Sequence, residues 1–154
     1  MSLEFTSPTQ HSPGTVFGLL KQAWQPLWNP KLAYKLRRFD GEVTQLPDTV
    51  GACTFITCQA GEPVGMGSYD PRQGPERGII GYNCVVPEHQ RKGIGCRQIR
   101  EILRIFRDKG FFRACVTTGD DDFFVPAQRM YEACGFVRMG QAKEDNIAYE
   151  LALA

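Results

Sequence analysis

The sequence has only two histidines, and no two of its six cysteines are separated by two residues. Zinc fingers and thioredoxin-like redox sites depend on such spacing, so neither kind of site is predicted. A run of about 18 apolar residues is also missing, which argues against a membrane-spanning helix. The start of the chain lacks the basic and apolar regions of a signal peptide. We therefore expect a cytoplasmic protein with reduced thiols and no bound metal.

Neither sign of charge is in clear excess. Eighteen lysines and arginines stand against 17 aspartates and glutamates, which gives a formal net charge of +1. Dedicated nucleic-acid-binding domains usually have a strong basic excess, so no nucleic-acid partner is predicted. The 154 residues are 42% hydrophobic and 23% charged, as expected for one globular domain. The opening Met1-Ser2-Leu3 resembles an expression-vector remnant and carries no weight in the fold prediction.

Residues 13–45 form the predicted helical part of the chain. After Pro13, apolar side chains recur at the spacing of one helix face. The segment Trp28-Asn29-Pro30 predicts a break, because proline suits the first turn of a second helix. The two expected apolar faces are Val16, Leu19, Leu20 and Ala23 in the first helix, and Leu32, Leu36 and Phe39 in the second.

From Gly51 onward the pattern changes to strands and later returns to helix. Strands are predicted over 53–58, 64–69 and 78–86, and the last is nearly all apolar, as in strands buried on both faces. An amphipathic helix ended by Gly110 is predicted over 95–109, because apolar residues recur at helical spacing at Ile99, Ile102, Leu103 and Phe106. Strands over 112–117, 136–139 and 147–153 and a helix over 126–133 follow. The fold class is therefore α+β with one sheet of mixed direction, and residues 78–117 are long enough for a parallel crossover.

The segment that carries chemistry joins the strand over 78–86 to the helix over 95–109. It contains two glycines one residue apart, Gly93 and Gly95, which permit a sharp turn and close approach of the backbone. A helix N-terminus attracts anions, and residues 91–109 add seven cations against two carboxylates. A P-loop would need lysine and serine or threonine where the chain has Cys96-Arg97. A dinucleotide-binding loop would need a third glycine in place of Gln98.

Two segments resemble the motifs of the GNAT superfamily of N-acetyltransferases. Gln90-Arg91-Lys92-Gly93-Ile94-Gly95 is similar to its Q/R-x-x-G-x-G/A signature, and residues 127–136 are similar to its A-x-x-x-Y-x-x-x-G-F segment. The resemblance covers roughly residues 51–154. It implies a GNAT-like single domain over residues 1–154, with residues 1–50 mainly helical on the acceptor side and the coenzyme-binding sheet after them. It also implies a mostly antiparallel sheet, flanked by helices, whose central parallel pair splays apart at the coenzyme site.

The resemblance further implies acetyl-coenzyme A as co-substrate and transfer of its acetyl group to a primary amine by direct attack. A backbone N–H near Val85 or Val86 would polarise the thioester carbonyl. Tyr131 would donate a hydrogen bond to the departing sulfur. The acceptor would be a small-molecule or peptide amine. The residues implied to bind the coenzyme are Cys84, Val85 and Val86 along the strand end and Gln90, Arg91, Lys92, Gly93, Ile94, Gly95 and Cys96 in the loop.

The chain departs from the family pattern in two places. The strand over 78–86 has no carboxylate where many members carry a glutamate as general base, and Phe124 stands where members often have asparagine. A catalytically silent domain that binds the coenzyme for regulation or sensing is therefore the alternative function. A covalent mechanism through Cys84 is disfavoured, because no partner base is adjacent in the sequence. The open candidates for the base are Asp70, Glu88, His89 and Asp120, Asp121 and Asp122.

Other features leave the partners open. The basic helix over 96–109 is an alternative nucleic-acid surface. The acidic run over 120–122 either attracts a cationic amine or forms a solvated loop. A homodimer through the sheet edges or the N-terminal helices is a further option that no sequence feature decides. No motif identifies the amine acceptor.

Overall fold

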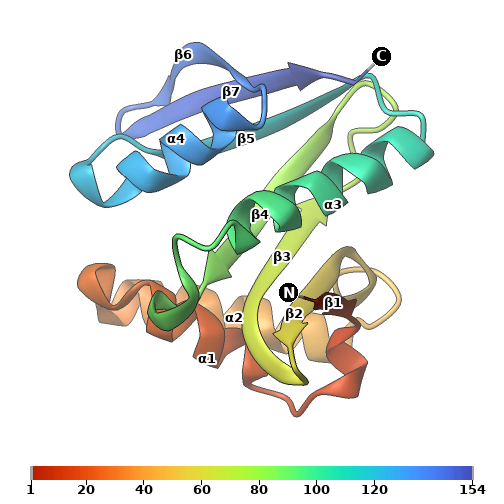
Figure 1. Ribbon diagram of the computed structural model, residues 1–154, viewed down its shortest axis with the longest axis vertical. Helices are drawn as coiled ribbons and strands as arrows, with labels where there is room; N and C mark the ends of the chain where they lie inside the picture. Colours follow the sequence, from red (N-terminus) through yellow and green to blue (C-terminus); the bar gives the residue numbers. More distant parts are fainter. Residues whose placement is uncertain (1, 154) are drawn as a thin grey trace. The chain divides into compact units, whose positions relative to one another are not determined.

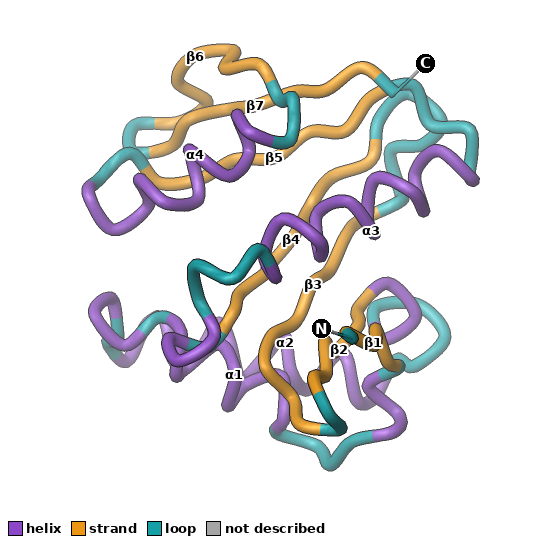
Figure 2. Tube along the Cα trace, in the orientation of Figure 1, coloured by secondary structure: helices purple, strands orange, loops and turns teal. Residues whose placement is uncertain are grey.

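The computed structural model describes residues 2–153 and has the predicted α+β fold (Figure 1, Figure 2). Its strands form one seven-stranded sheet in the order β1-β2-β3-β4-β5-β7-β6. The sheet is mostly antiparallel, and β4 and β5 form the parallel pair. The elements are β1 (Leu3–Thr6), α1 (Thr15–Ala23), α2 (Pro30–Gln45), β2 (Thr54–Gln59), β3 (Glu62–Asp70), β4 (Gly78–Val85), α3 (Ile94–Asp108), β5 (Arg113–Gly119), α4 (Val125–Ala133), β6 (Val137–Lys143) and β7 (Asn146–Ala152).

The chain divides into two compact units. The first holds the described residues up to Ser68 together with Tyr82–Gln98. The second holds Tyr69–Gly81 together with the described residues from Ile99 onward. The strands β3 and β4 and the helix α3 each contribute residues to both units, so each unit is described here by itself.

The first unit is built on the two predicted helices. The four apolar residues predicted for α1 are all buried, and Leu36 of α2 is completely buried. The predicted break is also confirmed, because Asn29 caps α2 by accepting a hydrogen bond from the Leu32 N–H at 2.8 Å, and Pro30 takes the first helical position. Leu32 and Phe39 are half-buried against the same core. Helical periodicity therefore located both elements and their inner faces.

The strand β1 corrects the sequence analysis, which gave the opening residues no weight. Leu3 packs against the core of the first unit, and β1 pairs antiparallel with β2 from Leu3 opposite Gln59 to Thr6 opposite Ile56. The Thr6 hydroxyl also donates to the Ile56 carbonyl at 2.8 Å. A four-residue strand is too short to show a period of two, so its place in the sheet depends on a partner distant in sequence.

The prediction that the strand over 78–86 is buried on both faces is wrong for its middle. Gly81 is exposed, and Tyr82 and Asn83 are only half-buried, whereas Cys84 and Val86 are buried. An apolar composition does not say which faces of a strand its neighbours cover. Here the partly covered residue Tyr82 borders a pocket.

The second unit confirms the remaining predicted elements. Ile99, Ile102, Leu103 and Phe106 of α3 are each at most 3% exposed. Gly110 ends this helix with φ of 75°, the left-handed conformation usual after a helix. The parallel crossover is confirmed, because Gly78 and Ile79 of β4 pair with Ala114 and Cys115 of β5. The splay of this pair at its far end stays a prediction.

Candidate functional site

The glycine loop ends in a helix N-terminus that suits an anion. The Arg97 N–H donates to the Gly93 carbonyl at 3.1 Å, which is the first hydrogen bond of α3. The N–H groups of Gly93, Ile94 and Gly95 therefore have no carbonyl four residues earlier within the helix, and the helix dipole favours negative charge beside them. Of the two glycines, Gly93 has φ of 81° and needs to be glycine, whereas Gly95 lies in the first helical turn.

Side chains hold this loop and give it positive charge. Gln90 donates from Nε2 to the Val85 carbonyl at 2.9 Å, which ties the loop to the end of β4. Arg91 and Lys92 are exposed at the loop. Further along α3, Arg104 is bound by Glu101 at 2.8 Å and by Asp108 at 2.7 Å, so part of the helix's positive charge is already paired. Arg91 and Lys92 thus add positive charge at the loop itself.

Gln98 is the most informative residue that the sequence analysis missed. It is completely buried, and its Nε2 donates to the carbonyls of Met66 at 3.1 Å and Cys84 at 3.2 Å. Its Oε1 accepts a hydrogen bond from the Thr57 hydroxyl at 2.7 Å. A buried amide with every partner in place is costly to build and rigid once built. The sequence could have indicated that Gln98 is buried, because it lies one helical turn after Ile94, on the apolar face of α3.

Gly65 on β3 provides the space for this amide. A Cβ added there would lie 2.5 Å from Gln98 Oε1 and 2.6 Å from the Cys84 carbonyl oxygen. The second of these contacts involves backbone, so it could not be relieved by turning a side chain. A glycine at this position is therefore required by close approach rather than by backbone conformation.

The hydrogen bonds at the end of β4 distinguish between the N–H groups of Val85 and Val86, the two candidates for polarising a thioester carbonyl. The Val86 N–H donates to the Val64 carbonyl at 2.9 Å and so points toward β3. In a trans peptide the C=O and the following N–H point in opposite directions. Because Gln98 holds the Cys84 carbonyl, the Val85 N–H of the same peptide points away from Gln98. The Val85 N–H is thus directed away from Gln98, whereas the Val86 N–H is directed toward β3.

Cys84 is unsuited to nucleophilic chemistry in this environment. Burial raises the pKa of its thiol to about 12, with a smaller opposing effect from a hydrogen bond to the Met66 backbone. The thiolate is the reactive form of cysteine, so Cys84 stays protonated and inert near neutral pH. This geometry agrees with the sequence-based argument against a covalent mechanism.

We expect the folded protein to protect Cys84 from alkylation. Iodoacetamide at pH 8 should modify Cys84 at least about a hundredfold more slowly in the native protein than after unfolding in guanidinium chloride, because the thiol is both buried and protonated. Peptide mapping by mass spectrometry over a time course measures both rates. Equal rates in the two conditions would contradict the burial and the raised pKa.

Tyr131 lies on α4 in the second unit, and the residue is only 3% exposed. The ring packs edge-on against Phe136 at 5.6 Å and at a tilt against Tyr149 at 5.9 Å. The neighbouring Tyr149 hydroxyl donates to Glu132 at 2.8 Å. The predicted site residues thus fall into two groups: the loop and strand end in the first unit, and Tyr131 in the second.

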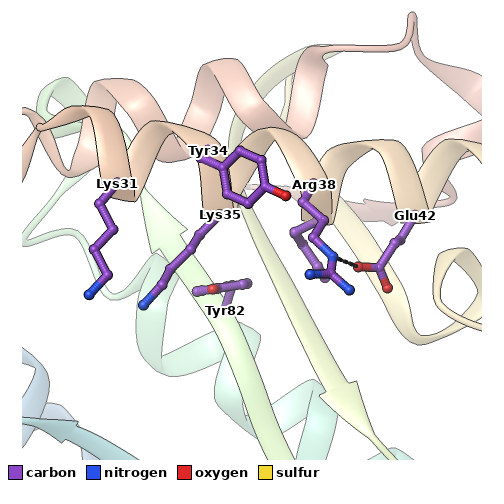
Figure 3. Close-up of a pocket in the computed structure, with 7 residues that line it drawn as sticks. Lys31, Tyr34, Lys35, Arg38, Glu42 and Tyr82 are labelled. Atoms are coloured by element: carbon purple, nitrogen blue, oxygen red, sulfur yellow. Dashed lines mark ion pairs between the residues drawn. The ribbon is translucent and has the colours of Figure 1, made fainter.

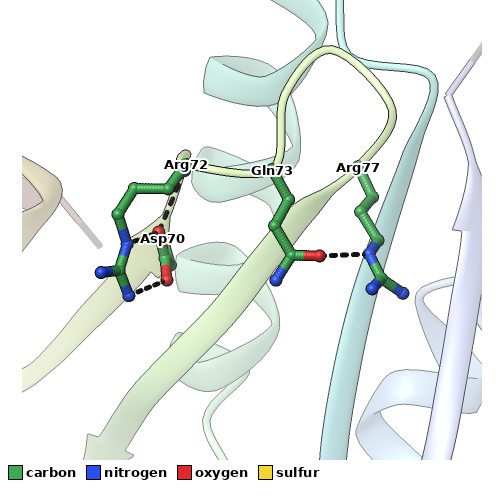
Figure 4. Close-up of polar contacts among 4 residues, drawn as sticks. All are labelled: Asp70, Arg72, Gln73 and Arg77. Atoms are coloured by element: carbon green, nitrogen blue, oxygen red, sulfur yellow. Dashed lines mark hydrogen bonds and ion pairs between the residues drawn. The ribbon is translucent and has the colours of Figure 1, made fainter.

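The structure weakens Asp70 as a candidate base. Arg72 donates to both of its carboxylate oxygens, at 2.9 Å from Nε and 2.7 Å from Nη2, beside a separate Gln73–Arg77 contact (Figure 4). These bonds to Arg72 lower the pKa of Asp70 against the smaller opposing effect of burial. A carboxylate stabilised in its charged form is a poorer proton acceptor.

The other candidates have local roles or stay open. Asp121 accepts a hydrogen bond from the Phe123 N–H at 3.0 Å, which makes it a cap for the turn before α4. Phe124, in the place of the family asparagine, packs its ring over Gly119. Glu88 is exposed, and His89 Nδ1 is buried without a hydrogen-bond partner among the described residues. Among residues 2–153, no group of three His, Cys, Asp or Glu side chains is placed to hold a metal.

Comparison with known proteins agrees with the geometry of the loop. Over residues 15–136 the sequence matches the family described as acetyltransferase (GNAT) family. The chain belongs to the GNAT acetyltransferase family. No curated protein matches the sequence. In the part of this GNAT chain that the structure describes, no helix has the length and apolar character needed to cross a bilayer.

Solved structures share the fold at low sequence identity. A GNAT-family acetyltransferase structure from Desulfovibrio desulfuricans has a TM-score of 0.81 at 20% identity, covering 99% of both chains. The PaiA N-acetyltransferase of Thermoplasma acidophilum, solved with coenzyme A, has a TM-score of 0.71 at 13% identity over 99% of both chains. The ribosomal-protein-S18-alanine N-acetyltransferase of Escherichia coli has a TM-score of 0.70 at 13% identity, covering 99% of this chain and 94% of the other. These likenesses show the GNAT fold.

Proposed function

We propose that this protein is an N-acetyltransferase that transfers the acetyl group of acetyl-coenzyme A directly to a primary amine. The observation that carries the proposal is the direction of the Val85 N–H at the end of β4, in the same unit as the anion-binding loop. Such a donor is suited to the negative charge that develops on a thioester oxygen during attack. Family membership supports acetyl transfer as the reaction.

The coenzyme would be held mainly through the backbone. Its pyrophosphate fits the N–H groups of Gly93, Ile94 and Gly95, with Gln90, Arg91, Lys92 and Cys96 beside them. Its pantetheine arm would follow the strand end at Cys84, Val85 and Val86. The Thermoplasma relative solved with coenzyme A supports this co-substrate. Together these contacts would place the thioester carbonyl at the Val85 N–H.

The reaction needs a neutral amine and a stabilised leaving group. An amine of ordinary pKa near 10.4 requires about 4.6 kcal/mol to lose its proton at pH 7, so a base or water path must take it. The amine nitrogen then attacks the acetyl carbon, the C–N bond forms and the C–S bond breaks. The oxyanion would be stabilised by the Val85 N–H. The family resemblance implies that Tyr131 donates a hydrogen bond to the departing sulfur. The products are the N-acetylated amine and free coenzyme A.

Thiol release in the presence of a panel of primary amines tests the proposal. We expect acetyl-coenzyme A turnover that depends on the amine and yields acetylated amine in equal amount. Calorimetric titration with coenzyme A distinguishes the enzyme from the alternative function, a domain that binds the coenzyme without turnover. Tight coenzyme binding without turnover on any amine would instead favour the catalytically silent sensing domain.

The loop should depend on the backbone conformation of Gly93. In Gly93→Ala the added Cβ meets nothing within 4 Å, but the φ of 81° is strained for alanine. That strain is about 1–2 kcal/mol, so we expect coenzyme affinity to fall by roughly five- to thirtyfold as the loop relaxes from its binding conformation. Calorimetric titration with coenzyme A measures the change.

Gly61→Ala is the matched control for this variant. Gly61 has φ of 79° and equally open space, but it lies in the turn between β2 and β3. We expect a similar loss of stability in denaturant and unchanged coenzyme affinity. Equal affinities in the two variants would remove the loop from the coenzyme site.

A further inference from the structure

The helix α2 and the middle of β4 border a pocket of about 430 Å³ in the first unit (Figure 3). Three cations on successive turns of α2 line it: Lys31, Lys35 and Arg38. Among the described lining residues the carboxylate is Glu42, whose Oε1 lies 3.6 Å from Arg38 Nε. Cations gathered around a concave surface focus a positive potential there. The pocket therefore has an excess of positive charge.

Two of these cations are not used by the protein itself. Within residues 2–153, Lys31 and Lys35 have no ion-pair partner. Figure 3 shows both side chains extending on the side of α2 that faces Tyr82. The Arg38–Glu42 pair is solvent-exposed, and such pairs are weak, so a stronger anion could compete for Arg38. All three cations are thus available to a ligand.

The remaining wall of the pocket is aromatic and carries tyrosine hydroxyl groups. Tyr82 is half-buried, and its ring packs against Phe39 at 4.9 Å and Trp24 at 5.7 Å. Burial, and to a smaller extent the charge of Glu42, raises the pKa of Tyr82, so its hydroxyl remains a donor at neutral pH. Tyr34 adds a second hydroxyl at the rim. A ligand with an apolar stem and an anionic end matches this combination.

The pocket also has a defined place relative to the proposed site of acetyl transfer. Tyr82 and Val85 lie on the same strand, three residues apart. At about 3.3 Å per residue, the pocket wall is on the order of 10 Å from the Val85 N–H along β4. A molecule anchored in the pocket could therefore extend a short chain to the thioester.

We propose that this pocket binds the anionic group, a carboxylate or a phosphate, of the small-molecule amine that accepts the acetyl group. The inference rests on the proposed acetyltransferase function and specifies its substrate class. The acceptor would carry its anionic group and its primary amine at opposite ends of an apolar stem. Lys31, Lys35 and Arg38 would bind the anion, and the aromatic wall would contact the stem.

A binding experiment tests the pocket without turnover. Glutarate and inorganic phosphate, titrated into the full chain without coenzyme, should shift the amide NMR signals of residues 31–42 and 82, whereas neutral glutaramide should not. Lys35→Gln should weaken glutarate binding by about tenfold or more, because it removes a charge-assisted hydrogen bond. Lys21→Gln is the control, since Lys21 is an exposed cation over Trp28 and not a lining residue. The proposal would be overturned if Lys35→Gln and Lys21→Gln lost glutarate affinity equally. Displacement of glutarate by saturating coenzyme A would also overturn it.

Kinetics then test the acceptor. Amino carboxylates of increasing length and aminoalkyl phosphates distinguish the two anionic groups, and alkylamines of matched length lack the charge. We expect the anionic acceptors to have a kcat/KM about tenfold or more above that of the matched alkylamine. The Lys35→Gln variant should lose this preference, whereas the Lys21→Gln control should keep it. Equal kcat/KM values for anionic acceptors and alkylamines would overturn the proposed role of the pocket, whereas the proposed acetyl transfer would still stand. Glutarate binding that needs Lys35, without turnover of any amine, would support the anion pocket and contradict the proposed function.

Discussion

Replacing Gln98 with leucine should lower kcat by roughly 10- to 100-fold and leave the KM for acetyl-coenzyme A nearly unchanged, because a misdirected oxyanion donor loses part of its stabilisation of the transition state. The substitution removes the hydrogen bond that fixes the Cys84 carbonyl and therefore the direction of the Val85 N–H. It also leaves the buried carbonyl of Met66 and the hydroxyl of Thr57 without this partner. We expect the free energy of unfolding to fall by about 1–3 kcal/mol.

Thr57→Val is the control that separates positioning from stability. It removes the hydroxyl that donates to Gln98 Oε1 but leaves both contacts from Nε2 to the backbone carbonyls. We expect a loss of about 1–2 kcal/mol in unfolding free energy and little change in kcat. Steady-state kinetics and guanidinium denaturation on both variants measure the two effects. A Gln98→Leu enzyme with the wild-type kcat but reduced stability would make Gln98 a purely structural residue.

Patterns among neighbouring residues correctly predicted the helices and the turns next to them. The apolar faces of α1 and α3 follow from helical periodicity, and Gly110 marks the end of α3 through its positive φ. The turn after β4 was recognisable because Gly93 has a positive φ, which favours glycine. In each case the residues that make the structure are close together in the sequence.

The parts that were missed depend on partners distant in sequence. β1 exists because Leu3–Thr6 pairs with β2, about fifty residues away in the chain. Gln98 was noticed only as the absence of a glycine, since its partners come from three different strands. The pocket on α2 needs Tyr82 of β4 beside Lys35, and these two residues are far apart in the sequence. Charge counts also overstated the free positive charge of α3, where Arg104 is paired with Glu101 and Asp108.

Tyr131→Phe should lower kcat by roughly a hundredfold, the low end for a positioned acid. An ordinary thiolate, with a pKa near 8.5, is a weaker base than an ordinary tyrosinate, with a pKa near 10, so a hydrogen bond to the sulfur is favoured over full proton transfer. We therefore expect the hydroxyl to act mainly as a hydrogen-bond donor to the departing sulfur. Coenzyme affinity should barely change, because the contact matters only once charge develops on sulfur. The pH dependence of the rate should also stay that of the wild type, since it reflects deprotonation of the amine.

Tyr149→Phe tests whether the effect belongs to Tyr131 or to the aromatic cluster. Tyr149 is completely buried, packs against Tyr131 at 5.9 Å and donates its hydroxyl to Glu132 at 2.8 Å. Removing that hydroxyl should cost about 1–2 kcal/mol of stability through the lost bond to a charged group, with little change in kcat. Tyr131→Phe keeps its ring against Phe136 and Tyr149, so its stability should fall by less than about 1.5 kcal/mol. A Tyr131→Phe enzyme that turns over a good amine at the wild-type rate would show that the sulfur is protonated by water or by the ammonium intermediate. If both variants lose activity only in proportion to their unfolding, Tyr131 is a packing residue of the second unit.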